Sequence, residues 1–177
     1  AHLMRAYAYE HLGRVDNARA GFDEAVRTSP DSEATRISRG LFRAATDREG
    51  ASEDFAVAIN IGTSVVAPYA LLAFFAVDAG RLDEGERLAR AALDRAFAPV
   101  PRALILEILA TAFLQRTPPQ VEEARLLLEE AVRLAPHIAH LQENLARVST
   151  QTTAVTRLDS RVVVSAFRDE APTLVAA

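Results

Sequence analysis

One stretch of this sequence occurs twice, and that repetition constrains the fold more than any other feature. Residues 18–30 read ARAGFDEAVRTSP, and residues 124–136 read ARLLLEEAVRLAP. In both copies the apolar residues recur at helical spacing, acidic residues lie toward the start, and a proline closes the segment. Weaker copies lie between them at 51–58 and 85–92. A helix pair that returns at intervals of about 34 residues indicates a stacked repeat array.

The spacing within each copy is that of a known repeat family. The pattern of a small residue, a large apolar residue four positions later and an alanine three positions after that, followed by a proline, resembles the second helix of a tetratricopeptide repeat. The segment before the first copy, with Ala6, Tyr9 and Gly13, resembles the first helix and turn of the same repeat. The resemblance is carried by residues 1–30, 80–96 and 118–136. It implies an all-α fold, a right-handed α–α superhelix of about four helix hairpins plus a C-terminal capping helix.

The last forty residues divide into a helix and a tail. After Pro136 the sequence HIAHLQENLARVST predicts one more helix, with Ile138, Leu141, Leu145 and Val148 inward and polar residues outward, as a capping helix requires. From about residue 151 the sequence is rich in β-branched residues and shows no helical stripe. Its segment RVVVSAFR is compatible with a strand, a docked extended tail or the start of a following domain. We therefore expect a repeat domain over 1–150 and a tail or linker, extended in places, over 151–177.

Glycine and proline mark the predicted connections. Gly13 and Gly80 each follow a predicted first helix, where a left-handed backbone conformation is expected. The prolines of 98–101 predict a loop. Thr117 and Gln120 have the spacing of a capping box at the start of a further helix.

Composition narrows the function classes. The net charge of −4 argues against a nucleic-acid scaffold, and no apolar run reaches membrane-spanning length. All positive side chains are arginines, as in bacterial-like, high-GC sequences, and the absence of cysteine excludes thiolate sites. The chain begins at Ala1 within an apparent helix, so we interpret it as a fragment whose start hides any signal peptide; a cytoplasmic location is favoured.

No motif predicts catalysis, a metal or a cofactor. The glycines are scattered, and no serine lies in a nucleophile turn. His137, His140 and Glu143 are spaced three apart, which spreads them over roughly 120° of a helix, whereas the usual helical zinc pair is four apart. We expect these histidines to face solvent, and we expect the protein not to be an enzyme.

Three arginines form the strongest candidate for ligand binding. Arg36, Arg39 and Arg43 fall within a sector of roughly 60° on one predicted helix. In the family that this chain resembles, first helices line a concave groove, where convergent guanidinium groups can grip carboxylates. The alternative is a solvated face paired with acidic residues of the following turn and helix, namely Asp47, Glu49 or Glu53.

The remaining groove candidates lie on the other predicted first helices. They are Tyr7, Glu10 and His11 on the first, Phe74 and Asp78 on the third, and Glu107 and Thr111 on the fourth. Tyr7 and Phe74 are alternatively core residues, because Tyr9 and Phe75 compete for the same contacts.

These features predict a non-catalytic scaffold that binds a protein or peptide, including an acidic segment, in its groove. An alternative is a structural or self-association module, whose end faces or tail dock onto another copy or onto another domain of the parent protein.

Overall fold

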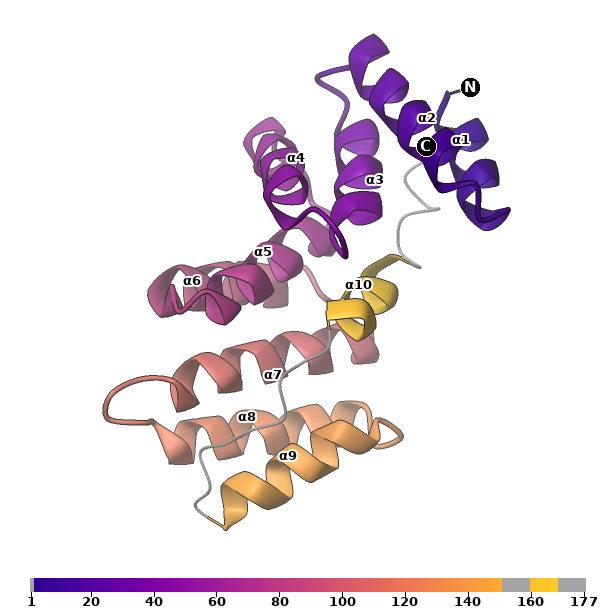
Figure 1. The fold of residues 1–177 in the computed structure, drawn as a ribbon. Helices are drawn as coiled ribbons and strands as arrows, with labels where there is room; N and C mark the ends of the chain where they lie inside the picture. The colour runs from indigo at the N-terminus through magenta and orange to yellow at the C-terminus, as the bar shows by residue number, and fades with distance from the viewer. Residues whose placement is uncertain (1, 151–159, 169–177) are drawn as a thin grey trace. The chain divides into compact units, whose positions relative to one another are not determined.

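The structure, a computed structural model, describes residues 2–150 and 160–168, the latter with side chains from residue 162 onward. All regular structure in these ranges is helical, as Figure 1 shows. The helices are α1 (His2–His11), α2 (Val15–Thr28), α3 (Glu33–Arg43), α4 (Arg48–Ile61), α5 (Val66–Asp78), α6 (Leu82–Leu93), α7 (Pro99–Leu114), α8 (Val121–Leu134), α9 (Ala139–Ser149) and α10 (Ser160–Arg168).

The chain forms two compact units, which we describe separately. The first unit comprises Ala1–Pro68 and Phe167–Ala177, and the second comprises Tyr69–Ala166. α1 to α4 lie in the first unit, and α6 to α9 lie in the second. The predicted domain boundary at residue 150 stays a prediction.

In the first unit, two helix hairpins pack through small residues. α1 pairs with α2, α3 pairs with α4, and α2 contacts α3. Gly13 connects α1 to α2 with a φ of 68°, the left-handed conformation expected from the sequence. Phe22 is fully buried with Ala6 and Ala18. A Cβ atom on Gly21 would lie 2.9 Å from the Cβ of Ala6, so glycine allows the closest approach of α1 and α2.

The second unit repeats this arrangement. Gly80 has a φ of 76°, as predicted, and a Cβ atom on Gly85 would meet Val77 at 2.5 Å. α7 pairs with α8, which in turn packs against α9. Leu141 and Val148 of α9 are buried and Leu145 is partly buried, as predicted for the inner face of the capping helix. Asn144, predicted to lie outward with the other polar residues, is instead buried, because it donates a hydrogen bond to Glu107.

Two predicted connections are wrong. Residues 98–101 are not a loop throughout, because α7 begins at Pro99 with both prolines in its first turn. The first turn tolerates proline because its N–H groups have no intrahelical partner. The expected capping box at Thr117 and Gln120 does not form; α8 starts after Gln120, whose side chain makes no capping hydrogen bond.

The tail is also more ordered than its sequence indicated. Residues 160–168 form α10, although the β-branched residues predicted no helix. The side chains of Val163, Val164 and Phe167 are buried, which accounts for a helix in a segment of low intrinsic helical preference. The predictions for 151–159 and 169–177 lie outside the described residues.

Within the described ranges, no helix is long and apolar enough to cross a membrane.

Candidate functional site

The first helices of the first unit meet at a polar contact. The Tyr7 hydroxyl on α1 donates to Ser38 Oγ on α3 over 2.7 Å. The Tyr7 ring packs edge-on against Phe22, with ring centroids 5.2 Å apart. Burial raises the pKa of the Tyr7 phenol above its ordinary value, although the hydrogen bond to Ser38 opposes that shift. Tyr7 is therefore half-buried and fixed, with one edge in the core.

Glu10 lies one turn beyond Tyr7 near the end of α1. Its Oε1 forms an ion pair with Arg168 Nη1 at 2.7 Å, and Arg168 Nη2 donates to the Leu41 carbonyl oxygen of α3 over 3.1 Å. We call Tyr7, Glu10 and the Leu41 carbonyl the α1–α3 surface. The next residue predicted for the groove, His11, is exposed at the end of the helix.

The three predicted arginines on α3 are all engaged by one buried carboxylate. Asp54 of α4 has no solvent exposure, and it accepts hydrogen bonds from Arg36, Arg39 and Arg43 at distances of 2.7 to 3.4 Å. Asp23 of α2 accepts from Arg39 and Arg43, each at 2.9 Å. Hydrogen bonding to Asp54 raises the pKa of Arg39, which keeps this guanidinium charged. We call these five residues the arginine cluster.

The partners of the arginines differ from those expected. Glu49 and Glu53 form no ion pair with them within the described residues, and Asp47 reaches only Arg43, at 3.9 Å. The main partner, Asp54, was not predicted from the sequence, because an aspartate in the middle of an amphipathic helix is usually exposed to solvent. Its signal was its position, three residues after Ala51 and next to Phe55, on the inner side of α4.

The three arginines and Ser38 therefore lie on two different sides of α3. The arginines are directed at α2 and α4, the second helices of their hairpins, through Asp23 and Asp54. Ser38 is directed at α1, the preceding first helix. The geometry of the arginine cluster is that of a structural network that ties three helices together, and its role in ligand binding stays a prediction.

In the second unit, Glu107 is also buried, with 1% exposure. Its Oε1 accepts from Asn144 Nδ2 at 2.7 Å, and its Oε2 lies 3.0 Å from His140 Nε2. The hydrogen bond to Glu107 raises the pKa of His140 above its ordinary value, against the opposing effect of burial. His140 was expected to face solvent; it is only partly exposed because it pairs with this carboxylate. Thr111 is half-buried and donates to the Glu107 carbonyl oxygen.

The two groove candidates on α5 are placed differently. Phe74 is only 5% exposed and lies 5.8 Å from Phe75 between ring centroids. Asp78 is partly exposed at the end of the helix. The buried Phe74 ring is not presented as the partly exposed anchor that we predicted; whether either residue binds a partner stays a prediction.

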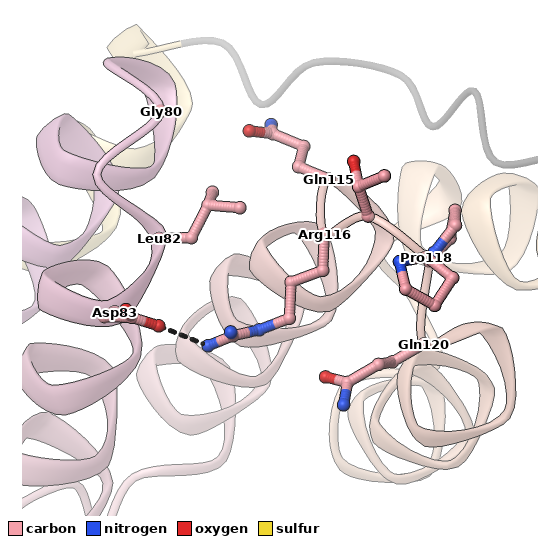
Figure 2. Close-up of a pocket in the computed structure, with 9 residues that line it drawn as sticks. Gly80, Leu82, Asp83, Gln115, Arg116, Pro118 and Gln120 are labelled. Atoms are coloured by element: carbon pink, nitrogen blue, oxygen red, sulfur yellow. Dashed lines mark hydrogen bonds and ion pairs between the residues drawn. The ribbon is translucent and has the colours of Figure 1, made fainter.

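A pocket of about 550 Å³ lies in the second unit, beside the α5–α6 turn and the α7–α8 connection. Figure 2 shows the residues that line it. Arg116 reaches across it to Asp83 at 2.9 Å and also pairs with Glu86. Hydrogen bonds from Arg90 and, to a smaller extent, from Arg116 lower the pKa of the Glu86 carboxyl below its ordinary value. The charges at the pocket are therefore matched within the protein. Leu82, Pro118 and Gln120 also line it.

Metal-ligating side chains do not converge anywhere in residues 2–150 and 160–168. Of the predicted group His137, His140 and Glu143, the described contacts give His140 a partner outside the group: its Nε2 lies 3.0 Å from the Glu107 carboxylate.

Comparison with known proteins agrees with this architecture. A family model described as tetratricopeptide repeat matches residues 1–33 and 76–137, more than half of the chain. The chain therefore belongs to the tetratricopeptide repeat family. The unmatched interval, residues 34–75, contains α4 and all of α3 except its first residue, the hairpin that holds most of the arginine cluster.

The crystal structure of MamA protein is similar in fold, with a TM-score of 0.72 at 12% sequence identity; the similarity covers 99% of this chain and 86% of the MamA chain. No curated protein matches the sequence significantly. The family match and the similarity to the MamA structure both confirm the predicted fold class, an all-α solenoid of the tetratricopeptide type. The family gives the protein the general character of a protein-interaction scaffold.

Proposed function

We propose that the protein is a non-catalytic scaffold that binds a protein or peptide segment on the α1–α3 surface of its first unit. The observation that carries this proposal is the Arg168 contact. A side chain far away in the sequence is held there by the Glu10 carboxylate and the Leu41 carbonyl oxygen. A surface that holds one such side chain offers the same two acceptors to a segment from another protein.

The other groove candidates support this surface less directly. Phe74 and Glu107 are buried, and the three arginines are already paired with Asp23 and Asp54. An acidic partner segment would engage the arginine cluster by replacing Asp23, whose side chain is 44% exposed, while Asp54 stays in place. The net charge of −4 supports protein partners over nucleic acid.

Selection from a phage library of random peptides on the immobilised chain tests the proposal. We expect clones that carry a cation beside an aromatic residue and that no longer bind Glu10→Arg. Asp31→Arg, the same charge change at an exposed residue of the α2–α3 connection, is the matched control and should retain binding. Clones that bind the Glu10→Arg variant as well as the unaltered chain would contradict the proposal. Acidic clones that are lost on Arg39→Gln would place an acidic ligand at the arginine cluster.

A second candidate function is self-association through an end of the repeat array. Met4, Leu12 and Val15, all in the first hairpin, are 61%, 68% and 54% exposed. Exposed apolar side chains of this size on a repeat favour stacking against another helix. Light scattering on the protein and on a Met4→Glu, Leu12→Glu variant tests this function: a dimer that the variant abolishes would support it, and a monomer at high concentration would exclude it.

A further inference from the structure

α10 has the features of a segment that needs a binding surface to fold. It has nine residues, and isolated helices shorter than about 12 residues are marginal in water. Val163, Val164 and Phe167 are buried, whereas Val162 and Ser165 are exposed. At 100° per residue the three buried side chains fall within about 100° of one another, so α10 is amphipathic with a narrow apolar face.

The end of this helix belongs to the first unit. Phe167 is fully buried, and Arg168 contacts two first helices of that unit, α1 through Glu10 and α3 through Leu41. Both contacts lie near the C-terminal ends of those helices, because α1 ends at His11 and α3 at Arg43. Carbonyl groups in the last turn of a helix have no intrahelical partner, and the helix dipole places partial negative charge there. The α1–α3 surface therefore attracts a cation for reasons that go beyond Glu10 alone.

The two acceptors select arginine over lysine. One guanidinium nitrogen bonds the Glu10 carboxylate while the other bonds the Leu41 carbonyl oxygen. A planar fork reaches two acceptors on different helices in one fixed geometry, whereas an ammonium group acts as a single point charge.

We propose that the Phe167–Arg168 end of α10 is a built-in occupant of the α1–α3 surface, and that the partner fitting this surface is a peptide segment whose C-terminal end carries an aromatic residue followed by arginine. This inference rests on the proposed function and names its ligand class. α10 then competes with such a partner. Because α10 is tethered, its effective concentration at the surface is high, and the partner binds well only when α10 is released.

A labelled peptide with the α10 sequence, SRVVVSAFR, tests the inference on the full-length chain. In the double variant Phe167→Asp, Arg168→Glu the chain's own helix loses its buried ring and its cation, so the surface is vacant. We expect the peptide to bind this double variant at least about tenfold more tightly than the unaltered chain, measured by fluorescence anisotropy. Adding Glu10→Arg to the double variant should abolish binding, while adding Asp31→Arg should leave it unchanged. A peptide that ends in lysine in place of arginine should bind more weakly.

Hydrogen exchange gives a second readout that does not depend on the added peptide. The amides of 160–168 should exchange at least about tenfold faster in Arg168→Glu and in Glu10→Arg than in the unaltered chain, and the combined charge swap should restore part of the protection. Equal peptide binding by the unaltered chain and the double variant, or unchanged exchange in both single variants, would overturn the inference. A dimer in light scattering that Arg168→Glu dissociates would also overturn it, since the occupant would then be the α10 of a second copy.

The failures of the two proposals differ. If phage-selected peptides bind through Glu10 but SRVVVSAFR does not bind the double variant, this inference fails and the proposed function stands. If Glu10→Arg affects neither the binding of phage-selected peptides nor the binding of SRVVVSAFR to the double variant, both fail.

Discussion

Among the residues that the structure describes, each unit buries one carboxylate, and the two are stabilised in different ways. In the first unit, Asp54 is fully enclosed by three arginines. In the second, Glu107 is held by the neutral amide of Asn144 and by His140. A guanidinium is charged at every accessible pH, but an imidazole changes charge near neutrality. The first site is therefore a permanent clamp between helices, and the second responds to pH.

Within the first unit, the arginine cluster and the α1–α3 surface differ in the same way. The arginine cluster holds all three positive charges of α3, yet each of its arginines is paired within the protein, with Asp54, with Asp23 and, for Arg43, also with Asp47 at 3.9 Å. The α1–α3 surface has a single carboxylate, Glu10, and a side chain from α10 balances it. The buried ion pairs of the arginine cluster stabilise the fold. The Glu10–Arg168 pair joins the surface to a separate segment, which another segment can replace.

The largest effect is expected from Asp54→Asn. The substitution leaves three arginines facing one another without their central negative charge, and removal of one partner from a buried ion pair costs about 3 kcal/mol or more. Urea unfolding followed by circular dichroism should show that loss. Asp23→Asn is the control: its carboxylate is 44% exposed, so the loss should be clearly smaller. Equal losses would show that Asp54 is not the centre of the cluster.

A smaller loss is expected from Glu107→Gln in the second unit. The amide oxygen can still accept from Asn144, but the charge-assisted bond to His140 disappears. Loss of one such bond costs about 1–2 kcal/mol, and urea unfolding at pH 6 measures it. A larger loss than that of Asp54→Asn would contradict the ranking of the two carboxylates.

The pH dependence should follow His140 and be smaller again. Glu107 and Glu143 face this imidazole, and its pKa is raised in the folded state. The extra stability is therefore complete below the ordinary imidazole pKa of about 6.5 and is lost as the pH rises through the raised value. The urea midpoint should fall between pH 6 and pH 8.5 in the unaltered protein and change less in His140→Gln. An identical fall in both would assign the dependence to other groups.

The smallest effect is expected at the exposed ion pairs. Arg125 on α8 pairs with Glu122 and Glu129 of the same helix, in solvent. Exposed pairs three or four residues apart add little to stability. Arg125→Ala should therefore leave the urea midpoint unchanged, and a shift comparable to that of Asp23→Asn would mean that surface arginines matter generally.

Helix periodicity and glycine turns were enough to predict the architecture. The repeated spacing of small and large apolar residues in 18–30 indicated a packed second helix, in which Ala18, Phe22 and Ala25 are buried, and Gly13 and Gly80 indicated the left-handed turns, because both signals are local. α10 could not be found in this way. Its β-branched residues have weak helical preference, and its helix depends on burial by parts of the chain that are remote in sequence.

The site was predicted only in part for a related reason. Spacing on α3 correctly grouped Arg36, Arg39 and Arg43, but it could not show that Asp54 approaches them from α4. Similarly, the spacing of His140 argued against a metal without indicating that Glu107 lies 3.0 Å away, 33 residues earlier. The pairing of buried polar groups is decided by which helices pack together, and that information is not present in any single helix.

Hydrogen exchange of the unaltered protein with and without a selected peptide partner tests the account most directly. We predict that the partner speeds exchange at the amides of α10, Ser160–Arg168, while the ends of α1 and α3 stay protected by the new occupant. Exchange at α10 that does not change, with new protection confined to α2 and α4 around Asp23 and Asp54, would place the ligand at the arginine cluster and contradict the account.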